Sequence, residues 1–139
     1  MKASDLFIKC LEEEGVTKIF GIPGEENADF MISLKKSKKI EFILCRHEQA
    51  AAFMADVYGR LTGKAGVCLA TLGPGVTNLM TGLADANMDR APVVAIIGQG
   101  STNRLHKESH QIMDSISMVA PISKWAQTIL SPKNITEVV

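Results

Sequence analysis

The chain has 139 residues, of which 46% are hydrophobic and 22% are charged. This length suffices for one domain with a hydrophobic core and is too short for two domains of ordinary size. The 15 basic side chains balance the 15 acidic ones, so the charge gives no indication of a nucleic-acid or membrane partner. No apolar run approaches the roughly 20 residues that span a bilayer. The three cysteines fit no zinc or redox spacing, which indicates buried thiols of a cytoplasmic protein.

Helical and strand-like patterns alternate along the chain. In chain order, we predict a helix over residues 4–14, a strand over 18–22, a helix over 26–36, a strand over 40–45, a helix over 48–61, a strand over 66–71, a helix over 76–88 and a strand over 92–97. Helical crossovers between strands predict a parallel sheet with right-handed connections. The expected fold is α/β, a doubly wound parallel sheet of the flavodoxin-like, three-layer α/β/α type, in a single domain over residues 1–139.

The last third of the chain is less regular. Residues 92–97 are almost wholly apolar, which is typical of a central strand covered on both faces. Residues 98–109 have no strong period and predict a surface loop. We then expect a helical turn over 112–118 and a strand over 122–129. Residues 131–137 resemble the opening turn of a helix, so we expect the chain to be a piece of a longer polypeptide.

An acidic residue, Glu48, stands where a strand gives way to an alanine-rich helix. In open α/β sheets, ligands bind outside the carboxyl ends of the strands, beside helix N-termini. An acid in a first helical turn is also favoured by the helix dipole without any function. Because Glu48 lies between a largely apolar strand and an alanine-rich helix, we expect it to be buried. Burial favours a neutral carboxylic acid that can donate a proton, so a catalytic acid and a helix start without function are both compatible with Glu48. His47 is interpreted as a capping or surface residue.

Two glycine turns lie between a strand and a helix, at Pro23-Gly24 and at residues 73–75. A residue without a Cβ lets the backbone approach a ligand closely. Neither turn matches the dinucleotide fingerprint or the phosphate-binding loop that ends in lysine. We expect both turns to converge with Glu48 on one crevice, where Asn78 either satisfies the helix start or points into the crevice.

Three polar residues, His106, His110 and Gln111, follow the strand predicted over 92–97 and fall on the same carboxyl-end side. The histidine spacing fits no metal motif, and we expect no metal ligands in this chain.

The helix after Glu48 carries small residues one turn apart, at Ala51, Ala55 and Gly59. This stripe permits a close approach of another element. Packing within the domain and contact with a second subunit are both compatible with it.

Several segments, in order and spacing, resemble thiamine-diphosphate enzymes. Within this family the chain most resembles the N-terminal, pyrimidine-binding domain of acetolactate synthase large (catalytic) subunits. The resemblance covers nearly the whole chain and is carried by residues 19–24, 46–51, 58–67, 71–79 and 92–99.

The resemblance implies a role for each candidate site residue. Glu48 would be catalytic, because the family's matching glutamate hydrogen-bonds N1′ of the cofactor's aminopyrimidine and favours its imino tautomer. The other implied cofactor-binding residues are Pro23, Gly24, Gly73, Asn78 and Gln111.

The resemblance also implies an activity, in which pyruvate is decarboxylated and condensed with a second 2-oxo acid. The family binds Mg²⁺ and the diphosphate through a Gly-Asp-Gly segment in a separate domain, and no such segment occurs here. FAD is possible in the full enzyme. The cofactor would lie between this domain and the diphosphate-binding domain of a second subunit of a homo-oligomer, so the isolated chain is expected to be inactive.

His110 occupies a position where many family enzymes of branched-chain amino acid biosynthesis have phenylalanine. Glu25-Glu26 follow Gly24 at a position where a second glycine is common in the family. These departures favour a catabolic or divergent form. Three alternatives remain open at this point: the pyrimidine-binding subunit of a split 2-oxo acid decarboxylase, a non-catalytic flavodoxin-like binding module, and a dimerisation domain.

Overall fold

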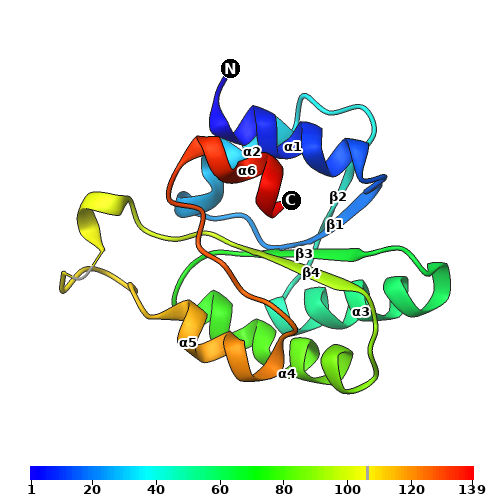
Figure 1. The fold of residues 1–139 in the computed structure, drawn as a ribbon. Coiled ribbons are helices and arrows are strands. Elements are labelled where there is room, and N and C mark those ends of the chain that lie inside the picture. The colour runs from blue at the N-terminus through cyan, green and yellow to red at the C-terminus, as the bar shows by residue number, and fades with distance from the viewer. Residues whose placement is uncertain (106) are drawn as a thin grey trace.

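The computed structural model describes residues 1–105 and 107–139. Four strands form one sheet in which every neighbouring pair is parallel (Figure 1). The strands lie in the spatial order β2-β1-β3-β4, and their bounds are β1 (Lys18–Gly21), β2 (Glu41–Leu44), β3 (Gly66–Ala70) and β4 (Val93–Ile97).

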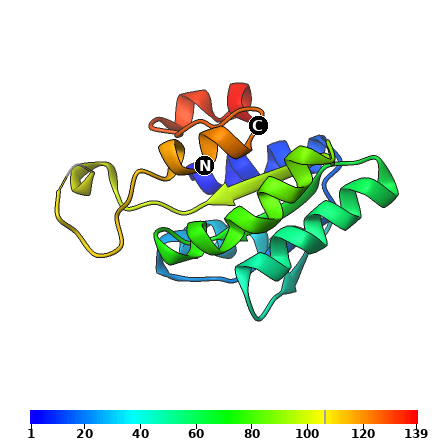
Figure 2. The same ribbon diagram turned by 90° about the horizontal axis from the view of Figure 1, so that it is seen from below.

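Helices cover both faces of the sheet. Helices α1, α2 and α6 lie on one face, and α3 and α4 lie on the other with α5 beside α4 (Figures 1 and 2). Their bounds are α1 (Ala3–Glu13), α2 (Ala28–Leu34), α3 (Glu48–Thr62), α4 (Pro74–Met88), α5 (Ser115–Val119) and α6 (Ile135–Val138). Short 3-10 helices are η1 (Glu25–Asn27), η2 (Thr102–Arg104), η3 (Ala120–Ile122) and η4 (Pro132–Asn134). The predicted doubly wound α/β/α fold is confirmed.

Side chains alternate between the two faces along each strand, as a pleated strand requires. Ile19, Val67 and Leu69 pack on the side of α1 and α2, whereas Phe20 and Cys68 pack on the side of α3 and α4. Every residue of β3 is buried, because this strand has a neighbour on each side and helices above and below. Among the described residues, no helix is long and apolar enough to cross a bilayer.

Small residues let α3 lie directly against α4 and β3 (Figure 2). A Cβ built on Gly82 of α4 would come within 2.6 Å of the Cβ of Ala52. A Cβ built on Gly66 of β3 would come within 1.9 Å of the carbonyl oxygen of Ala55. The small residues predicted as a stripe on α3 are all buried. The stripe therefore serves packing within the domain.

Arg60 joins α3 to α4 near the end of α3 that lies away from Glu48. Its guanidinium donates to both carboxylate oxygens of Asp56 at 2.8 Å, and it also reaches Asp85 at 2.9 Å and Asp89. The side chain of Asp56 is only 2% exposed, so its charge requires a partner. Hydrogen bonds to Asp56 and Asp89 raise the pKa of Arg60. The sequence analysis did not single out this cluster.

The strand predicted over residues 122–129 is wrong. Ile122 ends η3, and residues 123–130 pair with none of the four strands of the described sheet. The segment crosses from η3, which contacts α4, to α6, which contacts α1 (Figure 1). It therefore passes across the edge of the sheet instead of running along β4, and its backbone forms no ladder.

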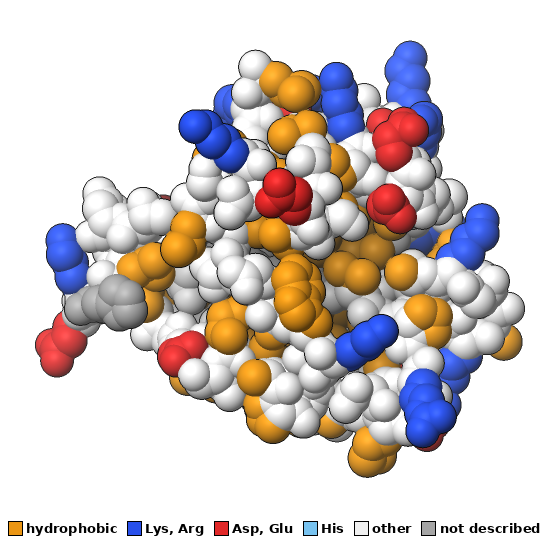
Figure 3. Space-filling view, viewed as in Figure 1, with side chains coloured by type: hydrophobic (Ala, Val, Ile, Leu, Met, Phe, Trp, Pro, Cys, Tyr) orange, Lys and Arg blue, Asp and Glu red, His pale blue; other side chains and the backbone are white. Residues whose placement is uncertain are grey.

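The prediction that residues 92–97 form a central strand is also wrong. In the described part of the chain, β4 is an edge strand and Val94 is 43% exposed. Trp125 and Leu130 of the crossing segment are exposed as well. Figure 3 shows apolar side chains gathered across the middle of the face that Figure 1 presents. The helical turn expected over 112–118 is α5, and the helix start expected over 131–137 is η4 with α6.

The Gly82 contact generates a prediction. In an exposed helix interior, replacing glycine by alanine stabilises a protein by about 1 kcal/mol. At Gly82 the new methyl group would overlap Ala52, so we expect Gly82→Ala to lower the free energy of unfolding by about 1–3 kcal/mol. Thr81→Ala, on the exposed side of the same helix, is the matched control and should not lower it. Urea denaturation measures both variants, and a Gly82→Ala variant as stable as the wild type would contradict the prediction.

Candidate functional site

The start of α3 presents Glu48 at the carboxyl end of the sheet. Strand β2 ends at Leu44, and α3 begins at Glu48 after an extended His47. The Nδ1 atom of His47 accepts a hydrogen bond from the backbone N–H of Gln49 at 3.1 Å. His47 therefore caps the helix, as expected, and its ring orientation is set by that bond.

The carboxylate of Glu48 leans toward the turn between β3 and α4. The side-chain amide of Asn78 donates to Glu48 Oε2 at 2.9 Å. The other oxygen, Oε1, lies 3.6 Å from the place where a Cβ on Gly75 would be. Glu48 is half-buried, so the expectation of full burial is wrong, but its carboxylate is held at a glycine turn.

The two glycine turns meet at Thr71. A Cβ built on Gly24 would lie 2.3 Å from Thr71 Cγ2, and a Cβ built on Gly75 would lie 3.2 Å from Thr71 Oγ1. The structure therefore brings the two turns together at this residue. Residue 71 was predicted only as the end of a strand, because its contact with Gly24 depends on the order of the strands.

The buried side-chain amide of Asn27 stabilises the Gly24 turn. The backbone N–H of Gly24 donates to Asn27 Oδ1 at 2.9 Å, and Asn27 is only 3% exposed. A cap of this kind satisfies a backbone donor that the turn leaves without a helical partner. Asn27 was missed from the sequence, although an asparagine three residues after a Pro-Gly turn is a recognisable capping signal. Pro23 lies exposed beside Gly24.

Gln111 closes over the second turn. Gly73 has φ 59° and ψ −119°, a region that residues with a Cβ rarely adopt. A Cβ there would lie 2.8 Å from both the Cβ and the carbonyl oxygen of Gln111, which itself has a positive φ of 57°. The structure thus brings Gln111 to the Gly73 turn. His110 is exposed, and His106 lies outside the described residues.

The cysteines contribute no reactive group to this site. Burial raises the pKa of the Cys68 thiol to about 12 and also raises the pKa of the Cys45 thiol, so both are protonated near neutral pH. Cys10 is half-exposed, contrary to the expectation that all three are buried. Within the described residues, no cluster of three or more acidic, histidine or cysteine side chains could hold a metal ion.

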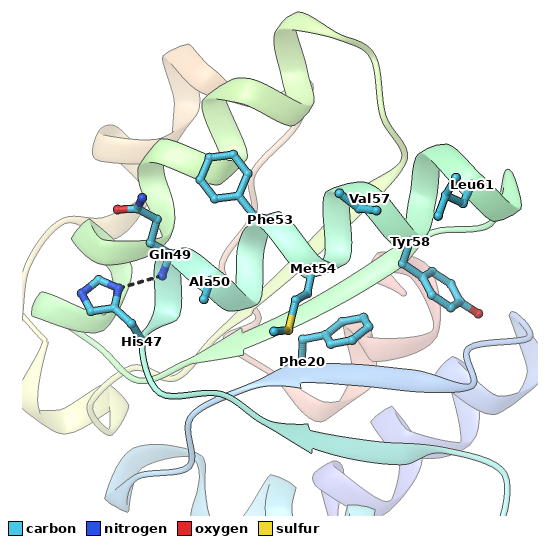
Figure 4. Close-up of a pocket in the computed structure, with 9 residues that line it drawn as sticks. All are labelled: Phe20, His47, Gln49, Ala50, Phe53, Met54, Val57, Tyr58 and Leu61. Carbon is cyan, nitrogen blue, oxygen red and sulfur yellow. Dashed lines mark hydrogen bonds between the residues drawn. The ribbon is translucent and has the colours of Figure 1, made fainter.

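An open apolar hollow borders the site along the exposed side of α3. It begins at His47, directly before Glu48, and its apolar side chains include Phe20, Met54, Val57 and Leu61. Figure 4 shows Met54, Val57 and Leu61 along α3, with Phe20 of β1 beside Met54. Leu61 is 82% exposed and Met54 and Val57 are about half exposed. Such an apolar surface is typical of a site that contacts another protein surface.

Chemically, the site offers one acid with two different oxygens. Glu48 Oε2 is held by a neutral amide, and Oε1 lies beside the backbone of Gly75. An arrangement of this kind can bind one polar group by a hydrogen bond to Oε1.

Comparisons with known proteins identify the family of the chain. The model of the family described as "Thiamine pyrophosphate enzyme, N-terminal TPP binding domain" matches residues 1–118. The chain is 45% identical to an acetolactate synthase of Bacillus subtilis over 99% of its length, covering 24% of that protein. It is 44% identical to a probable acetolactate synthase large subunit of Methanocaldococcus jannaschii, covering 99% of this chain and 23% of that one.

A third relative is a catabolic acetolactate synthase of Raoultella terrigena, 45% identical over 98% of this chain and 24% of that protein. The chain therefore spans about a quarter of the length of the relatives it matches. The family match covers most of the chain, including both glycine turns, Glu48, Asn78 and Gln111. The chain belongs to the thiamine pyrophosphate enzyme family and corresponds to its N-terminal TPP-binding domain.

Proposed function

We propose that this chain is the cofactor-activating, pyrimidine-binding domain of an acetolactate-synthase-like enzyme, which decarboxylates pyruvate and condenses the product with a second 2-oxo acid. The observation that carries the proposal is the half-buried carboxylate of Glu48, held by Asn78 where the two glycine turns meet. The printed names of the relatives support the reaction.

The residues present fit thiamine diphosphate at its pyrimidine end. Glu48 Oε1 lies 3.6 Å from the place where a Cβ on Gly75 would be, so no side chain of residue 75 covers that oxygen. In the proposed enzyme, Glu48 holds a ring nitrogen by a hydrogen bond, and Pro23, Gly24, Gly73 and Gln111 border the ring. When bound, thiamine diphosphate supplies the electron sink for breaking the bond between a carbonyl carbon and a carboxylate.

The role of Glu48 is to orient the ring and to exchange a proton with it through Oε1. A positioned acid or base of this kind contributes about 10²–10⁴-fold to a rate. The proposal places the ligands of Mg²⁺ and the diphosphate in a separate domain, as the resemblance to the family implies. We assign those ligands, and FAD where it is used, to other parts of the full enzyme.

The apolar side of α3 supports a partner. We infer that the diphosphate-binding domain of a second subunit covers this side, within a homo-oligomer. The support is the exposed row formed by Met54, Val57 and Leu61, which begins beside the site. The relatives are also about four times as long as this chain. The free cysteines support a cytoplasmic location.

The alternatives have less support. A split 2-oxo acid decarboxylase subunit and a flavodoxin-like binding module would both fit the fold alone. The relatives that match the chain over nearly its whole length carry the name acetolactate synthase. The dimerisation domain loses its main argument, because the small-residue stripe is buried within the domain.

One prediction concerns the isolated chain. Because it offers only one end of the proposed cofactor site, purified residues 1–139 should release no carbon dioxide from pyruvate when thiamine diphosphate and Mg²⁺ are added. Calorimetry should show little affinity for the cofactor. Turnover by the isolated chain would overturn the division of the site between domains.

A second prediction concerns Glu48 in an intact enzyme that contains this domain. Glu48→Gln keeps the size of the side chain and removes the acid, so kcat should fall by about 10²–10⁴-fold. The exchange rate of the cofactor's C2 proton, measured by NMR after acid quenching, should fall with it. The unfolding free energy of the 139-residue chain should change little. Proton exchange at the wild-type rate in this variant would show that Glu48 has another role.

A third prediction tests whether the cofactor ring lies beside Gly75 and Glu48. A Cβ on Gly75 would lie 3.2 Å from Thr71 Oγ1 and 3.6 Å from Glu48 Oε1, so the folded domain can accommodate alanine with a small shift. The methyl group would nevertheless occupy space assigned to the ring. Gly75→Ala should therefore raise the KM for thiamine diphosphate at least 10-fold in the intact enzyme with little loss of stability, whereas Thr81→Ala should leave the KM unchanged. An unchanged KM in Gly75→Ala would place the ring elsewhere.

A further inference from the structure

The hydrogen bond between Asn78 and Glu48 joins two residues that are 30 positions apart in the chain. Asn78 lies on the second turn of α4, and Glu48 is the first residue of α3. Both side chains are half-buried. Among the described residues, Asn78 is the one side chain that hydrogen-bonds the carboxylate of Glu48.

Asn78 does not serve the start of its own helix. The residue before α4, Gly73, has no side chain to cap it, and Thr77 directs its hydroxyl to the carbonyl oxygen of Pro74 at 2.9 Å. Asn78 lies beyond the first turn, where backbone N–H groups already have partners within the helix. Of the two roles that the sequence allowed for this residue, capping is therefore excluded.

The direction of the bond follows from the chemistry of the two groups. A carboxylate only accepts hydrogen bonds, and an asparagine amide has an NH₂ donor and an oxygen acceptor. Only the NH₂ end can face Glu48 Oε2 without repulsion. A neutral donor fixes the carboxylate without neutralising its charge, which a lysine or arginine would do.

The same bond distinguishes the two oxygens of Glu48. Oε2 is occupied by Asn78, and Oε1 lies on the side of Gly75, 3.6 Å from the place where a Cβ on that residue would be. A free glutamate on a helix start would exchange among several rotamers. In the structure, Glu48 adopts the rotamer in which Oε2 accepts the Asn78 hydrogen bond and Oε1 lies on the side of Gly75.

We propose that Asn78 is a positioning residue that acts through Glu48: it holds Oε2, selects a single rotamer of Glu48 and thereby makes Oε1 the working oxygen. The part that concerns the cofactor rests on the proposed function. The part that concerns the rotamer does not. Asn78 is thus assigned an effect on the cofactor through Glu48 instead of a direct contact with it.

The rotamer part is tested by NMR on the 139-residue chain, from the side-chain three-bond couplings of Glu48. The wild type should show one dominant rotamer. Asn78→Ala removes the donor and Asn78→Asp places a second carboxylate there, so both should give averaged couplings. Thr81→Ala, an exposed change on the same helix, should leave the couplings as in the wild type.

A reversed pair provides the rescue. In the double variant Glu48→Gln with Asn78→Asp, the glutamine amide donates to the aspartate, so a hydrogen bond forms again with its direction exchanged. Residue 48 should regain one dominant rotamer, although the acid is lost. Averaged couplings in the wild type, or equal couplings in the wild type and Asn78→Ala, would overturn the rotamer part of the proposal.

The effect through Glu48 is tested in the intact enzyme by a double-mutant cycle. Displacing a catalytic group by about 1 Å is worth about 10²-fold in rate, so Asn78→Ala should lower kcat by that order. In a Glu48→Gln background the same change should have almost no further effect, since there is no acid left to position. Multiplying effects of the two substitutions would show that Asn78 contacts the cofactor independently and would overturn this part.

The proposed function and the positioning role of Asn78 can be contradicted independently of each other. If the intact wild-type enzyme does not turn over pyruvate, the proposed function is wrong, while the NMR couplings still decide whether Asn78 positions Glu48. If the enzyme is active and Asn78→Ala changes neither the couplings nor kcat, the proposed function stands and the positioning role is wrong.

Discussion

The close packing of α3 against α4 and β3 is the constraint on which the site depends. A Cβ on Gly82 would overlap Ala52, and a Cβ on Gly66 would overlap Ala55, so neither position has room for a larger side chain. Because the helices lie this close, the first residue of α3 comes within hydrogen-bond reach of the second turn of α4. A wider spacing would leave Glu48 facing solvent and Asn78 without its acceptor.

The helix pair is fixed near both ends by polar contacts of different kinds. Near the C-terminal end of α3, Arg60 binds carboxylates of α3 and α4. At the other end, the neutral amide of Asn78 holds Glu48 and leaves one oxygen available. The charged contact is suited to holding the helices together, and the neutral one is suited to a group that must retain its own charge for chemistry.

The sheet brings the remaining groups to the same place. In a parallel sheet all strands end at one edge, so the turns after β1 and β3 and the start of α3 after β2 are neighbours. Thr71 fills the space between the two glycine turns, and Gln111 packs on Gly73 from a loop beyond β4. The site is thus assembled from four separate parts of the chain.

Period and turn chemistry were enough to predict the alternation of strands and helices, the parallel sheet, and the approach of the two glycine turns to each other. They could not predict contacts that depend on packing between elements, such as Asn78 with Glu48, Arg60 with Asp85, or Thr71 with Gly24. The apolar composition of residues 92–97 also led to the wrong prediction that β4 is a central strand, since an edge strand can be equally apolar. The strand predicted over 122–129 failed because a strand needs a paired neighbour, and this segment crosses the sheet edge.

The central claim is that the carboxylate of Glu48 is presented at the meeting point of the two glycine turns as the group that receives the cofactor's pyrimidine ring. A crystal structure of an intact enzyme containing this domain, with thiamine diphosphate bound, tests it most directly. The account predicts a ring nitrogen within hydrogen-bond distance of Glu48 Oε1, the ring beside the turns at Gly24 and Gly75, and Asn78 still bound to Oε2. A ring bound away from these turns, with Glu48 directed into bulk solvent, would contradict it.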